Sequence, residues 1–150
     1  MKGEKVMPEA GERLRAWTLV DELVLDVFVL TRKIATQGYE DLPAALRASA
    51  LQAALKVVHG VHGGPSELAT CVRSALGTLA EFRYHLYLSR RLGLIDVRRY
   101  RAVALRLEKT QKCLRELLAG HEGPAPAPEP PFAAPAFEPP EALVQGNGGP

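Results

Sequence analysis

Apolar residues recur along most of the chain at the three- and four-residue spacing of α-helices, and turn-forming residues divide the pattern into four segments. The segments span residues 12–36, 41–59, 66–91 and 96–120. None of them alternates in the manner of a β-strand, and the connections between them are short. The pattern therefore predicts an all-α fold, an antiparallel up-and-down four-helix bundle.

Residues at the segment boundaries support these limits. Asp41, Ser66 and Asp96 are suited to capping helix N-termini, because a side-chain oxygen can accept a hydrogen bond from a free backbone N–H. Pro43 is tolerated in a first helical turn, and Gly93 is suited to ending the third helix. We expect residues 1–11 to be a flexible N-terminus and residues 12–120 to form one domain.

The last thirty residues have a different composition. Residues 121–150 contain nine prolines and four glutamates, with no Lys or Arg. Such a segment buries too little apolar surface to offset the entropy of ordering, so it is predicted to be a disordered tail. It is either a solvated extension or a weak docking segment anchored by Phe132 and Phe137.

The formal net charge of +2 hides an uneven distribution. Residues 1–120 carry 19 basic and 13 acidic side chains, a net charge of +6. Within residues 83–115 there are ten basic side chains and two acidic ones, a net charge of +8. The positive charge therefore belongs to the end of the third helix, the following turn and the fourth helix.

The fourth helix separates its apolar and basic positions. Four cations surround Leu105 on a face away from the apolar positions, and further arginines continue this face across the turn. The predicted nucleic-acid-binding residues are Arg91, Arg98, Arg99, Arg101, Lys109 and Lys112. A solvated face is the simpler interpretation of such a pattern, but few acidic residues interrupt it, which favours an anionic partner.

Two further arginines lie on an apolar face instead. Arg83 and Arg90 are seven residues apart, in line with the apolar positions of the third helix. An unpaired guanidinium there would be costly, and Asp21 of the first helix is the candidate partner. We predict a structural ion pair among these three residues.

The second helix has apolar residues on two faces. One face can fill the bundle core, whereas Leu51, Leu55 and Val58 lie on another. This second face predicts a homo-oligomer interface, although a deeply buried helix would show the same wide apolar arc.

The sequence offers few candidates for catalysis. Phosphate-loop, dinucleotide-binding, zinc-protease and hydrolase motifs are absent. Cys71 and Cys113 lack metal-ligand spacing and are interpreted as packing residues, and His59 and His62 lack further ligands nearby. We expect no enzyme activity, no cofactor and no metal. No stretch has the length of a signal peptide or a membrane span, so we expect a cytoplasmic protein with no membrane partner.

With the helices placed, the chain resembles a known group of small four-helix-bundle proteins. It includes the 23S rRNA intervening-sequence proteins and the accessory variability determinant of diversity-generating retroelements. The resemblance covers about residues 14–119 and rests on LRAW, ELVLDVFVLTRKI, LPAALRASALQAALKVVHG and LAEFRYHLYLSRRLGLIDVRRYRAVALRLEKTQKCLRELL. The intervening-sequence branch usually has Gln, Ser, Asn and Glu where this chain has Ala45, Gln52, Lys56 and His59. The accessory-protein branch does not require them.

The resemblance implies a non-catalytic ring of five subunits. Its basic exterior would bind a reverse transcriptase and structured template RNA during mutagenic retrohoming. The alternatives are an intervening-sequence-type protein or a protein-interaction scaffold without a nucleic-acid role. A third is a helical ribonuclease, because Arg115 lies six residues before His121, as in the HEPN nucleases.

Overall fold

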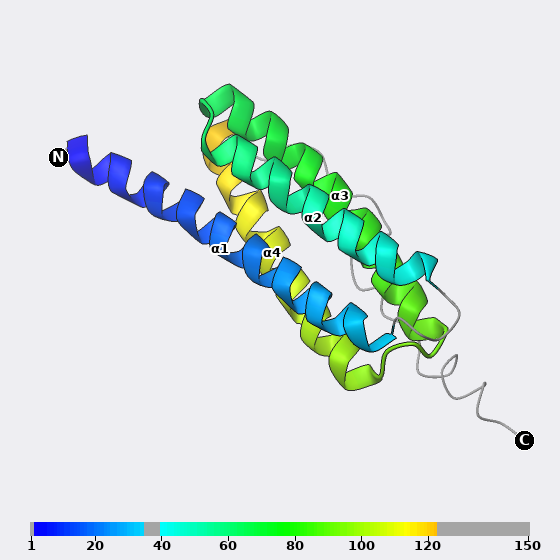
Figure 1. The fold of residues 1–150 in the computed structure, drawn as a ribbon. Coiled ribbons are helices and arrows are strands. Elements are labelled where there is room, and N and C mark those ends of the chain that lie inside the picture. Colours follow the sequence, from blue (N-terminus) through cyan, green and yellow to red (C-terminus); the bar gives the residue numbers. More distant parts are fainter. Residues whose placement is uncertain (1, 35–39, 123–150) are drawn as a thin grey trace, which may run out of the picture.

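The computed structural model describes residues 2–34 and 40–122. Four helices follow one another along the chain (Figure 1): α1 (Lys2–Ile34), α2 (Asp41–Val61), α3 (Pro65–Arg91) and α4 (Val97–Glu122). The prediction of an all-α four-helix bundle is confirmed. Of the predicted disordered tail, residues 123–150 lie outside the described residues, whereas residues 121 and 122 belong to α4. No described helix combines the length and apolar character needed to cross a membrane.

Each helix packs against the helices that precede and follow it, and α1 also packs against α4. The interhelical hydrogen bonds show the relative directions of α1 and α2. Arg13 donates to the backbone oxygen of Val61 at 2.9 Å, whereas Arg47 donates to Thr31 at 2.6 Å. A residue early in α1 thus contacts the end of α2, and a residue late in α1 contacts the first part of α2. These two helices therefore run in opposite directions.

The core lies along the axis between the four helices. All four contribute fully buried apolar side chains, and Phe82 is the largest of them. On α1 the buried apolar positions are Ala16, Val20, Leu23, Val27, Leu30 and Ile34. They alternate in steps of four and three, the spacing that keeps side chains on one face of a helix. Removal of these apolar side chains from water is the main contribution of this face to the stability of the fold.

Helix α2 approaches α3 closely near the connection between them. A Cβ atom added at Gly60 would lie 2.8 Å from Cβ of Cys71. Only glycine fits there without displacement of the neighbouring backbone, so Gly60 sets the spacing of the two helices. Cys71 is half-buried and Cys113 is buried, and both thiols are free. Burial raises the pKa of the Cys113 thiol above its ordinary value.

Several predicted boundaries shift. Helix α1 begins at Lys2 rather than near Glu12, and α4 continues through Gly120 to Glu122. The N-cap of α3 is Gly64, followed by Pro65 in the first turn, so Ser66 lies inside the helix. Proline supports that start because its fixed φ suits a first turn.

Candidate nucleic-acid interface

The turn between α3 and α4 is fixed at both ends. At the end of α3 the N–H of Leu94 donates to Ser89 at 3.0 Å and that of Gly93 to Arg90 at 3.1 Å, while Gly93 has a φ of 77°. This is the Schellman arrangement, in which a left-handed residue ends a helix. At the start of α4 the backbone N–H of Arg99 donates to Oδ1 of Asp96 at 2.8 Å, so the predicted cap is confirmed.

Exposed cations follow the outer face of α4 beyond this turn. We call Arg98, Arg101, Lys109 and Lys112 the basic stripe. All four are exposed, as is Leu105 between them, with 54% of its surface accessible. The separation of a buried face from a basic face on α4 therefore agrees with the sequence pattern.

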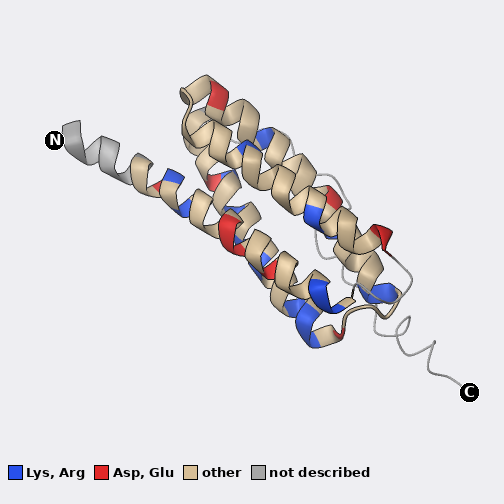
Figure 2. Ribbon diagram, viewed as in Figure 1, with Lys and Arg blue, Asp and Glu red and all other residues tan. Residues whose placement is uncertain are grey.

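The bundle brings a further group of cations to the end at which α4 begins. We define this basic end by Arg32, Lys33, Arg90, Arg91, Arg98 and Arg99. Figure 2 shows Lys and Arg segments gathered where α1 and α3 end and α4 starts. The carboxylates of Glu40, Asp41 and Asp96 belong to the same end. Arg32 and Lys33 were not predicted from the sequence as binding residues, because only the fold places the end of α1 beside the start of α4.

Aromatic contact orients one of these arginines. The guanidinium of Arg91 lies over the Tyr87 ring, 5.8 Å from its centroid. A cation placed over an aromatic face is attracted by the ring quadrupole. Arg91 is exposed, so its donors remain available to an anionic partner.

The predicted structural ion pair is wrong. Asp21 is exposed, and among the described residues no ion pair joins it to Arg83 or Arg90. The guanidinium of Arg83 instead donates to Oε1 of Gln111 on α4 at 2.8 Å, and Arg90 is half-buried at the end of α3. The error arose from the apolar arc of α1, which is wider than its buried face. Asp21 follows buried Val20 and is therefore turned away from it by about 100°.

Arg106 makes interhelical ion pairs instead. Nη1 of Arg106 lies 2.6 Å from Glu22, and Nε lies 3.0 Å from Asp26, so one guanidinium joins α4 to two carboxylates of α1. The hydrogen bond to Asp26 is the main cause that raises the pKa of Arg106 above its ordinary value, against the opposing effect of burial. The four-residue spacing of Glu22 and Asp26 is a signal that could have identified this pair.

Replacing Arg106 by leucine is expected to lower the free energy of unfolding by about 1 kcal/mol, because two charge-assisted bonds are lost at a half-exposed site. Thermal unfolding followed by circular dichroism measures this as a fall in Tm of a few degrees. Arg98→Leu is the matched control, since it removes the same charge from the exposed stripe. Equal Tm values for the two variants would show that the pairs contribute nothing.

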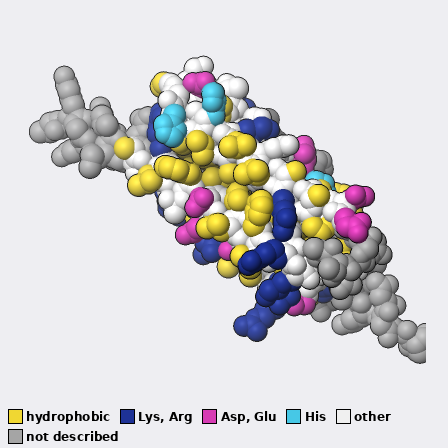
Figure 3. Space-filling view, viewed as in Figure 1, with side chains coloured by type: hydrophobic (Ala, Val, Ile, Leu, Met, Phe, Trp, Pro, Cys, Tyr) yellow, Lys and Arg dark blue, Asp and Glu magenta, His cyan; other side chains and the backbone are white. Residues whose placement is uncertain are grey.

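A second exposed surface lies along α1 and α2. We call Trp17, Leu25, Phe28, Leu51, Leu55 and Val58 the apolar strip. Leu55 is 59% exposed and Leu51 43%, whereas Val58 is half-buried. Figure 3 shows hydrophobic side chains gathered on this face. The guanidinium carbon of Arg47 lies over the Phe28 ring, 5.0 Å from its centroid. The predicted second apolar face of α2 is therefore exposed, and aromatic residues of α1 extend it.

His59, His62 and His121 contact separate partners. Nε2 of His59 lies 2.9 Å from Glu67, whereas Nδ1 of His62 donates to the backbone of Val58 and its ring packs edge-on against Trp17. Across the described part of the chain, no group of three or more His, Cys, Asp or Glu side chains is arranged to hold a metal. His121 lies within α4 and donates from Nδ1 to Leu117, and Arg115 is exposed on the same helix.

No protein-family model matches this chain, and no curated protein matches it.

Proposed function

We propose that the protein is a non-catalytic, oligomeric scaffold that binds structured RNA through the basic stripe and the basic end. The observation that carries the proposal is the exposure of all four stripe cations on one face of α4, continuous with the arginines at the capped turn. Cations spread over an extended face suit the phosphates of a folded RNA, which is bound mainly through its backbone and shape.

The resemblance to accessory variability determinants supports a more specific partner. We propose that the RNA is the template of a diversity-generating retroelement and that its reverse transcriptase is the second partner, in mutagenic retrohoming in the cytoplasm. The apolar strip would join copies of the chain, with Leu51, Leu55 and Val58 at the interface and a ring of five subunits as the proposed assembly.

The apolar strip also favours a second candidate function. A protein-interaction scaffold, or an intervening-sequence-type bundle, would use the same exposed leucines and would need no nucleic acid. In that case the basic stripe serves solubility alone. RNA binding separates the two functions.

The test is binding of a structured RNA to the full chain across a salt series. If four to six cations contact phosphates, affinity should fall by roughly 10²- to 10³-fold between 50 and 200 mM salt, through release of counterions. Fluorescence anisotropy of a labelled RNA hairpin measures this slope. Absence of binding at low salt would contradict the proposal and favour the protein-interaction scaffold.

A further inference from the structure

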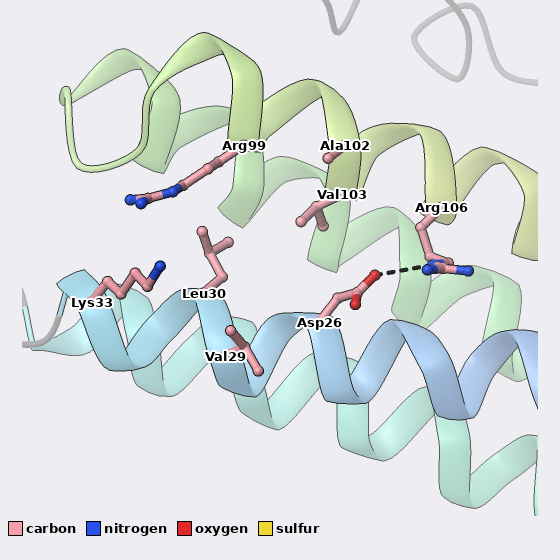
Figure 4. A pocket seen from close by; sticks show the side chains of 8 residues that line it. All are labelled: Asp26, Val29, Leu30, Lys33, Arg99, Ala102, Val103 and Arg106. Carbon is pink, nitrogen blue, oxygen red and sulfur yellow. Dashed lines mark hydrogen bonds and ion pairs between the residues drawn. The ribbon is translucent and has the colours of Figure 1, made fainter.

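A surface pocket of about 390 Å³ lies between α1 and α4, beside the basic end (Figure 4). Its volume is at the lower end of the range in which proteins bind small ligands. Four apolar residues, Val29, Leu30, Ala102 and Val103, contribute to its lining, together with Asp26, Lys33, Arg99 and Arg106.

The charged residues divide between the two ends of the pocket. Figure 4 shows the charged groups of Lys33 from α1 and Arg99 from α4 both lying beyond Leu30, at the opposite end of the pocket from the Asp26–Arg106 pair. Within the described residues no carboxylate forms an ion pair with Lys33, and the only one recorded for Arg99 is a long contact of 3.9 Å with exposed Asp96. Two cations from different helices thus converge with little neutralisation.

The other end of the pocket offers an acceptor. Oδ2 of Asp26 accepts from Nε of Arg106 at 3.0 Å, while the carboxylate remains 39% exposed. Its second oxygen makes no hydrogen bond to another described residue. A ligand that spans this pocket therefore meets two cations, then an apolar floor, then a carboxylate that accepts hydrogen bonds.

We infer that this pocket binds a nucleoside phosphate. The phosphate is held by Lys33 and Arg99, the sugar and base cover Leu30 and Val103, and a ribose hydroxyl donates to Asp26. Arginine suits a phosphate because its planar donors can bond two oxygens, and carboxylates recognise ribose hydroxyls in other nucleotide sites. Two other classes of ligand fit the pocket less well. Inorganic phosphate would make no contact with the apolar floor, and the apolar tail of a phosphate ester would lie against the Asp26 carboxylate.

The inference rests on the proposed function when the nucleotide belongs to a bound RNA. A free mononucleotide carries the same chemistry. If the nucleotide belongs to an RNA, the pocket binds a terminal nucleotide of that RNA, at the edge of the surface that binds the RNA backbone. If the ligand is a free mononucleotide, the pocket is a small-molecule site separate from the RNA-binding surface.

The experiment is titration of the full chain with AMP, adenosine and inorganic phosphate, followed by the methyl NMR signals of Leu30 and Val103. AMP should shift both signals and bind more tightly than the other two probes. Arg99→Ala should weaken AMP binding about tenfold through loss of a charge-assisted contact. Arg98→Ala, which removes the neighbouring exposed arginine outside the pocket, should change it less than twofold.

A second variant tests the space itself. Ala102→Phe fills the pocket from an exposed helical position and keeps all its charges, so it should abolish the AMP shifts while circular dichroism remains unchanged. Equal effects of Arg98→Ala and Arg99→Ala, or equal affinity for AMP and inorganic phosphate, would overturn the inference. An undiminished response to AMP in Ala102→Phe would also overturn it.

Competition identifies the source. Displacement of AMP by a short single-stranded RNA with a 5′-phosphate, but not by the same RNA without it, supports the RNA terminus. AMP binding that neither RNA displaces supports a free nucleotide. If AMP fails to bind while the RNA hairpin still binds with a steep salt dependence, the pocket inference fails and the proposed function stands.

Discussion

Replacing Arg98, Arg101, Lys109 and Lys112 together by glutamate is expected to lower affinity for a structured RNA by about 10³-fold or more. Each exposed cation contributes roughly 1 kcal/mol through a phosphate contact, and 1.4 kcal/mol corresponds to a tenfold change. Reversal of the sign adds repulsion to the loss of attraction. Filter binding or anisotropy with the labelled hairpin at 100 mM salt measures the change.

The fold should survive this substitution. All four side chains are exposed, and glutamate is a good helix former. Circular dichroism of the variant should therefore match that of the parent. As a matched comparison, Lys112→Glu should weaken RNA binding more than Arg73→Glu, which reverses an exposed charge on α3 away from the stripe. Equal losses from these two single variants would mean that RNA responds to net charge and not to the stripe.

Replacing both Leu51 and Leu55 by glutamate is expected to convert the proposed oligomer into monomers. Burying one leucine in an interface contributes about 1.5 kcal/mol or more, and a carboxylate in its place must be desolvated. The pair of substitutions should weaken association at least 100-fold, which corresponds to about 2.7 kcal/mol. Light scattering coupled to size exclusion, at micromolar concentration, measures the mass directly.

The control adds the same charge to a different helix. Ser74→Glu together with Ala80→Glu adds two carboxylates to exposed positions of α3, outside the apolar strip of α1 and α2, so the mass should stay that of the parent. A parent that is already monomeric at this concentration would contradict the oligomer. A double leucine variant that keeps the parent's mass would place the interface elsewhere.

The sequence predicted the parts of the fold that depend on local chemistry. Gly93 and Asp96 identified the turn between α3 and α4 because each forms its hydrogen bonds within a few residues of its own position. The exposure of Leu51 and Leu55 followed in the same way from the helical period of α2. Local hydrogen bonds and periodicity are properties of a single segment, so they can be predicted without knowing the neighbours.

Features that depend on the neighbouring helix were harder to predict. Trp17 and Phe28 belong to the apolar pattern of α1 but are exposed along the apolar strip. Because their spacing predicted both to be buried, the buried face of α1 was predicted too wide and wrongly included Asp21. Lys33 joins Arg99 only because α1 ends beside the start of α4. The basic end is therefore a product of the fold, and charge counts along the chain could identify four of its six cations.

The hydrogen bonds at Gly93 and Asp96 have a consequence for the rate of RNA binding. Both ends of the turn are closed by bonds within the chain, so the backbone that carries Arg90, Arg91, Arg98 and Arg99 has no folding step to complete when RNA arrives. Encounter is then governed by diffusion and electrostatic steering, which salt weakens. The association rate constant should accordingly fall as salt rises, with no concentration-independent phase to indicate a slow rearrangement of the protein.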